Sequence, residues 1–281
     1  MNKLIKEGTL ALLVGTLIYW GLSQINFMKI MKLDESKGNV FEQLGKFYIE
    51  DLEKTTHLYN DSLSLNFLDT LKTRICLSNQ IDTSNLKIYL FEHEVFNAYA
   101  LPGRRIVLNS ELIRFSENAD EVAAVLAHEL AHIELNHVKK NVVSQMTIQI
   151  LIAAASGTIN STAANGIAEL GFSKYSRVTE QEADNKALEY LQNANINPIH
   201  MVNLFNRMAK ELEAKDEHII DFEFLSSHPE TKKRAAEIKS KIKEKQHFTP
   251  TYDPTAFKYL QNKLTNGSQQ EAKEIREVYI P

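Results

Sequence analysis

Apolar residues recur at the helical period of 3.6 over most of this chain. This spacing predicts helices at 41–60, 63–77, 120–133, 176–191 and 229–245, and a terminal helical region at 257–264 and 269–278. Three short segments rich in β-branched and aromatic residues, 86–91, 95–100 and 106–108, predict strands, with a turn at 101–104 before the last one. The pattern indicates an α+β fold that is predominantly helical and contains a small sheet.

The segment 120–133 is predicted to be a partly buried helix. Its apolar positions share one face and are Val122, Val125, Leu126, Leu130 and Ile133. Ser116 or Asn118 can cap its start, and Asp120 and Glu121 suit the positive end of the helix dipole. We therefore expect the residues that follow to be presented from a regular helix.

This helix carries the sequence His128-Glu129-Leu130-Ala131-His132. Two imidazoles four residues apart project from the same helix face and can bind a single divalent metal, and neutral imidazole nitrogen suits Zn²⁺. Glu129 lies where it could take a proton from water beside that metal. Two surface histidines would have polar neighbours, whereas this pair is surrounded by Ala127, Leu130 and Ala131, so we favour a metal site.

Catalytic zinc usually has three protein ligands, so a third must come from elsewhere in the chain. In the predicted helix at 176–191, Glu180 and Asp184 share a face at i and i+4, and Glu182 should point away. Glu180 could reach the metal while Asp184 accepts the outer N–H of a ligand histidine. Alone, such an acidic cluster is usually a solvated face, but paired with the histidine motif it favours a ligand role.

Four ordered elements resemble those of the M48 zinc metallopeptidases, in particular the singly anchored or exported branch of quality-control proteases. They are 97–103 with the 106–108 strand, 128–132 with His137, 176–184, and 227–230 with Arg234. The resemblance implies a zincin-type fold whose small sheet lies beside the motif helix, and one Zn²⁺ per chain. It implies that Glu180 is the third ligand, that Asp184 supports a ligand, and that an exposed strand edge at Asn97 and Ala98 pairs with substrate.

The role of His228 stays open at the level of sequence. It could donate a hydrogen bond to the oxyanion of the reaction, as our candidate second catalytic residue beside Glu129. The resemblance also allows it to occupy the metal as a plug, and before Pro229 it could simply cap the predicted helix. For His137 we favour a helix-end histidine that bonds a carbonyl over a metal ligand.

Other chemistries have little support in the sequence. It has no P-loop, no G-x-G-x-x-G and no G-x-S-x-G motif, and its one cysteine, Cys76, excludes a CxxC knuckle or an internal disulfide. A net charge of −4 gives no indication of nucleic-acid binding, and the basic runs are interleaved with acids, as on solvated faces. We expect one catalytic domain at 32–281, following an N-terminal segment at 1–31.

That N-terminal segment predicts export through a membrane. Positions 8–28 carry no charged side chain, which gives about 31 Å of helix, near the thickness of a bilayer core. We favour an uncleaved transmembrane anchor, with the catalytic domain on the periplasmic face of a bacterial inner membrane, over a cleaved signal peptide that releases the domain. The apolar stretch at 142–172 could be a second membrane segment, but polar interruptions favour a core or membrane-apposed helical hairpin.

Two functions remain open. The favoured one is a zinc endopeptidase that acts on polypeptide substrates, with the removal of misfolded or damaged envelope proteins implied by the resemblance. The alternative is a protease-like binding protein or chaperone that holds metal in a plugged site.

Overall fold

A computed structural model gives the structure of the chain and describes residues 37–145, 175–214, 220–242 and 248–279. Two compact units divide the chain, Met1–Gln43 and Leu44–Pro281. The second unit holds the sheet and most of the helices, and the description that follows is of this unit. The predicted boundary after residue 31 lies outside the described residues and stays a prediction.

Both predicted membrane segments lie mostly or wholly outside the described residues. This holds for the anchor at 8–28 and for 146–172 of the apolar stretch, whose described residues 142–145 are helical. Within the described ranges, every helix is too short or too polar to span a bilayer.

The sheet has three strands, as predicted from the sequence. They are β1 Lys87–Phe91, β2 Ala98–Leu101 and β3 Arg105–Asn109, in the order β1-β3-β2. Central strand β3 is parallel to β1 and antiparallel to β2. The turn between β2 and β3 uses Gly103 and Arg104, both with positive φ, and glycine adopts that conformation without steric cost. The strand order leaves β2 at one edge of the sheet.

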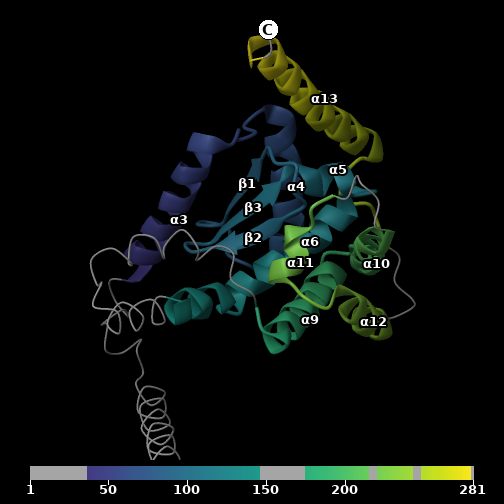
Figure 1. Cartoon of the computed structure of the whole chain (residues 1–281). Coiled ribbons are helices and arrows are strands. Elements are labelled where there is room, and N and C mark those ends of the chain that lie inside the picture. The colour runs from purple at the N-terminus through teal and green to yellow at the C-terminus, as the bar shows by residue number, and fades with distance from the viewer. Residues whose placement is uncertain (1–36, 146–174, 215–219, 243–247, 280–281) are drawn as a thin grey trace, which may run out of the picture. The chain divides into compact units, whose positions relative to one another are not determined.

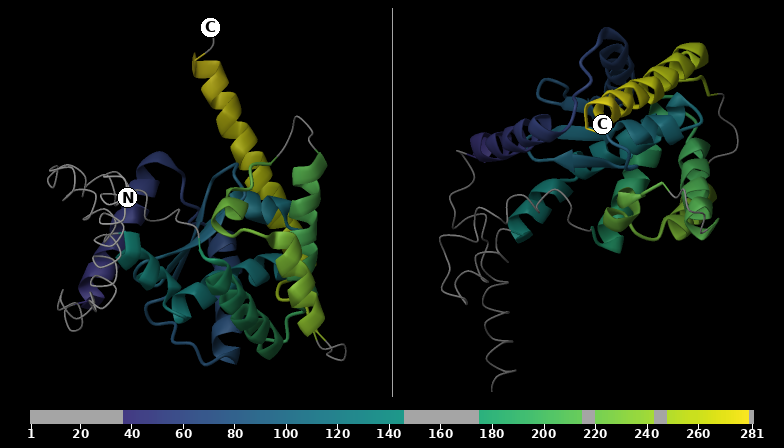
Figure 2. Two further views of the ribbon diagram at one scale, coloured as in Figure 1. Left: turned by 60° about the horizontal axis from the view of Figure 1, so that its bottom comes forward. Right: turned by 45° about the horizontal axis from the view of Figure 1, so that its top comes forward.

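Helices surround this sheet, and the most extensive helix packing is between α6 Ala119–Glu134 and α9 Arg177–Asn193. Figure 1 shows α6 beside the sheet with α9 next to it, and the views in Figure 2 agree. α6 also contacts β2 and β3, so it lies between the sheet and α9. Other helices are α3 Lys37–Thr55, α4 Ser62–Ser78, α5 Ser110–Phe115, α10 Ile199–Ala214, α11 Glu223–Ser227, α12 Thr231–Lys241 and α13 Pro254–Tyr279.

α6 forms where its local signals predict it, but it is more buried than expected. Asn118 caps the helix, since its side chain accepts a hydrogen bond from the Glu121 backbone N–H. Every residue from Ala119 to His132 is buried, so the helix is central to the core and not amphipathic. Even Glu121 is fully buried, because Arg207 of α10 compensates its charge at 2.9 Å.

Two helices differ from the prediction near the C-terminus. α12 begins at Thr231, two residues later than expected, because Glu230 adopts a left-handed conformation with φ 65°. A single helix, α13, spans both predicted terminal segments.

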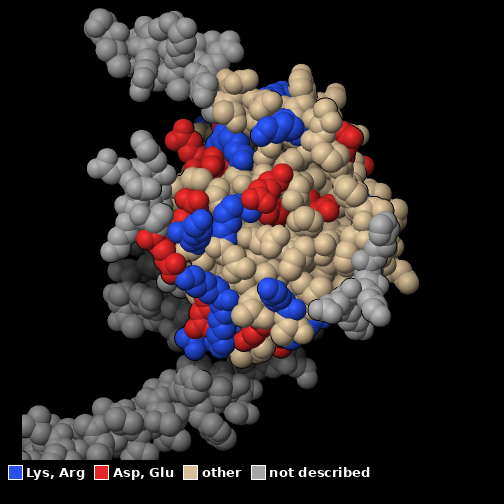
Figure 3. Space-filling view, turned by 90° about the vertical axis from the view of Figure 1, so that its right-hand side faces the viewer, with Lys and Arg blue, Asp and Glu red and all other residues tan. Residues whose placement is uncertain are grey.

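Charges on the surface are mixed in sign. On the face drawn in Figure 3, basic and acidic side chains lie among one another. On α12, Lys232 pairs with Glu213, and Lys233 lies 3.9 Å from Glu237. These two lysines agree with the prediction that the basic runs are solvated faces. Arg234 of the same run contradicts it, because this side chain is buried and pairs with Glu180 and Asp184.

Candidate metal centre

α6 presents both histidines of the motif toward one point. His128 and His132 are fully buried, and their Nε2 atoms lie 3.1 Å apart. This closeness follows from the helix, because residues i and i+4 lie one above the other on the same face. Two ring nitrogens that face each other in a buried site are the arrangement that a shared cation would stabilise.

The first turn of α9 brings a carboxylate to the same point. Ser176 caps α9 through the Thr179 backbone N–H, which places Glu180 in the first helical turn. The carboxylate oxygens of Glu180 lie 3.4 Å from His132 Nε2 and 3.6 Å from His128 Nε2. The structure thus brings together the three residues that the sequence predicts as ligands.

His228 joins them from the loop between α11 and α12. Its Nδ1 lies 2.9 Å from Glu180 Oε1 and 3.3 Å from His128 Nε2, and its ring stacks on Phe224. The side chain does not cap α12. Its backbone N–H instead closes α11 by donating to Phe224 O, so of the roles left open by the sequence the helix cap is not formed. His228 belongs spatially to the cluster.

The four side chains fit a zinc ion by their chemistry and proximity. One ligand atom from each of His128, His132, Glu180 and His228 lies within 4.8 Å of the others, and all four residues are buried. Imidazole nitrogen and carboxylate oxygen are the donors that tetrahedral Zn²⁺ prefers, and catalytic sites usually combine three such ligands with an open position. Zinc held by all four would be closed, whereas three of them would leave that position free.

The two motif histidines differ in their electrostatic surroundings. Burial lowers the pKa of His132 well below its usual value, which favours the neutral form that binds metal. Burial also lowers the pKa of His128, but the hydrogen bond to Asp184 and the charge of Glu180 outweigh it and raise the pKa overall. The same negative charge would stabilise a metal cation.

Glu129 lies beside the cluster without belonging to it. Its Oε2 accepts a hydrogen bond from the Ala100 backbone N–H at 2.9 Å, and its Oε1 lies 3.4 Å from His228 Nε2. Burial raises the pKa of this carboxyl, although His228 and His128 oppose the shift. A carboxylate with a raised pKa, held next to the metal position, is suited to accept and return a proton.

Asp184 and Arg234 support the cluster from behind. Asp184 Oδ1 lies 3.1 Å from His128 Nδ1, the nitrogen that faces away from the other ligands. Arg234 of α12 donates two 2.7 Å hydrogen bonds to Asp184 and lies 2.6 Å from Glu180. Although burial opposes it, Arg234 and His128 hold the pKa of Asp184 at about 2. Burial likewise opposes the lowering of the Glu180 pKa, but His228 and His132 hold it well below its usual range.

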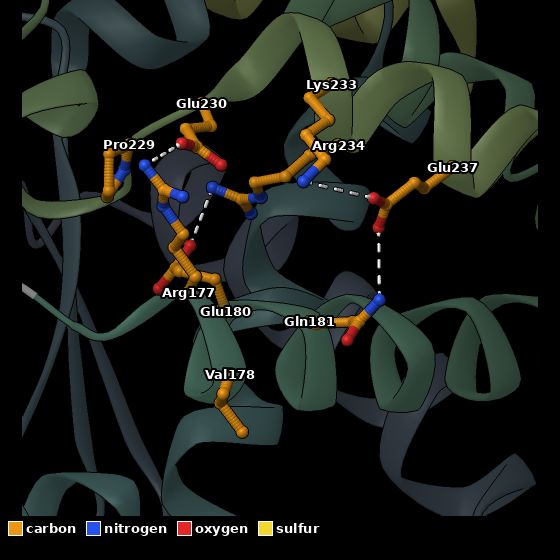
Figure 4. Close-up of a pocket in the computed structure, with 9 residues that line it drawn as sticks. All are labelled: Arg177, Val178, Glu180, Gln181, Pro229, Glu230, Lys233, Arg234 and Glu237. Atoms are coloured by element: carbon orange, nitrogen blue, oxygen red, sulfur yellow. Dashed lines mark hydrogen bonds and ion pairs between the residues drawn. The ribbon is translucent and has the colours of Figure 1, made fainter.

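A pocket of about 110 Å³ borders this cluster between the starts of α9 and α12. Figure 4 shows Glu180 and Arg234 in its wall, with the ion pair between Arg177 and Glu230 beside them. Arg177 lies 2.6 Å from Glu230 and is largely exposed. The pocket therefore connects the surface of the molecule with the side of Glu180 that faces Arg234.

The strand edge at Asn97 and Ala98 is not exposed, which contradicts the expectation from sequence. The two residues are 2% and 0% exposed. The Asn97 side chain accepts from the Ala98 backbone N–H and donates to Glu223 of α11. A substrate-binding role for these residues stays a prediction, and in this conformation the edge is covered.

His137 has partners that the sequence did not predict. Its Nδ1 lies 3.1 Å from His132 Nδ1, and its Nε2 lies 3.1 Å from Glu182 Oε2, so a histidine and a carboxylate replace the expected carbonyl. Glu182 points away from the cluster as predicted, with its side chain 54% exposed.

Two further residues contact the cluster, and the sequence assigned neither of them a role. Tyr175 stacks on His132 with ring centroids 3.9 Å apart, and no sequence signal marked it. A signal for Arg234 did exist, because two carboxylates buried near one metal call for a compensating cation.

Comparisons with known proteins agree with this site. The sequence profile described as peptidase family M48 matches residues 69–242, more than half of the chain. The chain is 27% identical to the beta-barrel assembly-enhancing protease of Yersinia pestis over 60% of this chain and 37% of that protein. It is 28% identical to the metalloprotease LoiP of Escherichia coli over 56% of this chain and 62% of that protein.

A third relative comes from a eukaryote. The chain is 33% identical to the mitochondrial metalloendopeptidase OMA1 of Saccharomyces cerevisiae over 49% of this chain and 41% of that protein. In each of these three comparisons, the matched stretch spans less than two thirds of the relative's length.

Proposed function

The chain belongs to peptidase family M48, and from this premise we propose that it is a zinc endopeptidase that hydrolyses peptide bonds in misfolded or damaged proteins of the cell envelope. The hydrolytic part rests on one observation, the convergence of His128, His132 and Glu180 beside a buried Glu129. Similarity to a protease named for enhancing beta-barrel assembly supports an envelope substrate.

The residues of the chain divide the work of hydrolysis among themselves. His128, His132 and Glu180 would hold Zn²⁺, which when bound polarises the substrate carbonyl and acidifies water. Glu129 takes a proton from the attacking water and returns it to the leaving amine, a role worth about 10²–10⁴-fold in rate. In this assignment, His228 donates a hydrogen bond to the negative oxygen that develops on the substrate.

A specific observation favours a second candidate, a plugged site. His228 lies among the four donor residues, 2.9 Å from Glu180 and 3.3 Å from His128. If its ring binds the metal, no position is open for water, and the protein holds metal while rarely cutting. The chain would then act as a binding protein or chaperone until the loop between α11 and α12 withdraws.

Digestion of casein by the purified, zinc-loaded protein tests these assignments. Glu129→Gln should abolish cleavage while retaining one zinc per chain, because Glu129 is no ligand. Equal cleavage by the wild type and Glu129→Gln would refute the hydrolase proposal. Zinc content measured on the same samples separates loss of metal from loss of chemistry.

His228→Ala separates the two roles of His228. A plug predicts that this variant cuts faster than wild type, whereas an oxyanion donor predicts a loss of about 10²–10³-fold in kcat. His57→Ala is the matched control, since His57 is exposed and absent from the cluster.

We place the catalytic domain on the exported side of a bacterial inner membrane, at its periplasmic face, anchored by 8–28. The uncharged length of this segment supports the assignment. Cleavage of the same segment as a signal peptide would release a periplasmic protein. Detergent-free fractionation of the full chain distinguishes the two, because an anchored chain sediments with membranes.

A further inference from the structure

We propose that His137 and Glu182 form a hydrogen-bonded relay that fixes the tautomer and orientation of His132, which makes both of them positioning residues for zinc. The inference rests on the proposed zinc site and assigns a role to residues that are not ligands. His137 is absent from the four-residue cluster, and so is Glu182.

The relay is continuous from the cluster to the surface. His132 Nδ1 lies 3.1 Å from His137 Nδ1, and His137 Nε2 lies 3.1 Å from Glu182 Oε2. The side chain of His137 is 1% exposed, whereas that of Glu182 is 54% exposed. Both ring nitrogens of a buried histidine are therefore used, one toward a metal ligand and one toward a solvated carboxylate.

Hydrogen-bond chemistry gives this chain of contacts one direction. His132 turns its Nε2 toward His128 and Glu180, so this nitrogen must be unprotonated to bind zinc. A neutral imidazole then carries its proton on Nδ1, which donates to His137 Nδ1. His137 must accept there and carry its own proton on Nε2, which donates to the Glu182 carboxylate. Every step matches a contact in the structure.

The contacts around the His132 ring leave it little freedom to turn. Tyr175 stacks on the His132 ring and limits its tilt, so the contact with His137 sets the remaining rotation in the ring plane. His137 is thus in a position to orient His132 without competing for the metal.

The two motif histidines receive different support. Buried Asp184 contacts His128 directly, while His132 reaches a carboxylate only through a second imidazole. Partners that orient a ligand histidine typically affect metal affinity by about 10–100-fold. Because solvent screens Glu182, its removal should lie near the lower end of this range.

The affinity of the full chain for zinc ion tests the relay. Competition with a chromophoric chelator measures it. His137→Ala should weaken zinc binding by about 10–100-fold. His137→Asn places an acceptor oxygen where Nδ1 lies and should recover most of the affinity. Glu182→Ala should weaken binding by about tenfold, whereas Glu189→Ala should not. Glu189 is the matched control, with a side chain 53% exposed on the same helix.

A double-mutant cycle distinguishes a relay, in which His137 and Glu182 act together on zinc affinity, from independent effects of the two residues on the fold. Glu182→Ala should weaken zinc binding in the wild type and have no effect in His137→Ala, because the link is already broken. Equal effects in both backgrounds, or unchanged affinity in His137→Ala, would overturn the proposal. If His137→Ala fails to fold, the comparison of Glu182→Ala with Glu189→Ala still decides, since both side chains are largely exposed.

Failure of the relay and failure of the proposed function give different results. A wild type that binds zinc and digests casein, with a His137→Ala variant of equal affinity, refutes only the relay. A wild type that retains no zinc refutes both.

Discussion

Replacing Arg234 by methionine should destabilise the metal-free protein far more than loss of any surface ion pair. Arg234 is 6% exposed at its side chain and binds Asp184 and Glu180, which are 6% and 2% exposed. Removing it leaves two carboxylates buried without their cation. Methionine retains apolar contact with Phe205, on whose ring Arg234 lies at 4.8 Å, so the loss is mainly electrostatic.

The expected magnitude follows from this burial. Breaking a buried ion pair by removing one partner costs about 3–5 kcal/mol, because the remaining charge is left uncompensated. For a domain of this size, each kcal/mol lowers Tm by about 2–4 °C, so Arg234→Met should lower Tm by about 6–20 °C. Removing the opposing charge as well, in Asp184→Asn with Arg234→Met, should recover part of the loss.

Urea unfolding, followed by far-UV circular dichroism, measures the loss of unfolding free energy in Arg234→Met. A chelator is present so that no metal compensates the charge of Glu180. The matched control is Arg177→Met, which breaks the pair with Glu230 at a side chain 77% exposed. The control should cost less than about 1 kcal/mol. An Arg234→Met variant no less stable than the control would refute the view that buried charge compensation holds this site together.

Three further predictions concern other parts of the molecule. Gly45→Ala should destabilise the protein by about 1–3 kcal/mol in thermal unfolding, because a Cβ there would lie 2.0 Å from the backbone oxygen of Pro102; greater stability would contradict this packing. Although burial opposes the shift, Lys263 and Ser64 hold the pKa of Asp61 at about 2, below its usual value of 3.8. The ionised Asp61 should therefore contribute its full stabilisation above pH 3.8 and lose it as pH falls through about 2. Denaturant titrations at a series of pH values should show no such loss in Asp61→Asn. Zinc at about 100 times its Kd should stabilise the protein by about 2.7 kcal/mol, and His128→Ala should remove this increase in calorimetry.

Local sequence signals predicted the helix that carries the site. The period of apolar residues, the cap at Asn118 and the spacing of His128 and His132 all concern residues within a few turns of one another. Glu180 was predicted by chemistry, because two ligands are too few for catalytic zinc. The structure brings these side chains together, since helical geometry fixes which side chains share a face. Their role as ligands stays a prediction.

Other features of the site depend on which elements pack together. The covered edge at Asn97 depends on Glu223, and the support of Asp184 depends on Arg234, each contact joining distant parts of the chain. No periodicity predicts such pairs. The left-handed conformation of Glu230 likewise delayed the start of the predicted helix to Thr231, although nothing in its residue type required that conformation.

The sequence by itself therefore determined the helices, the three strands and the chemical type of the candidate ligands, because these follow from spacing and donor chemistry along short segments. Only the tertiary structure decided that His228 lies against Glu180 and that His137 reaches Glu182. It also decided the direction of each pKa shift, because desolvation and charge at a side chain are set by all the elements that surround it.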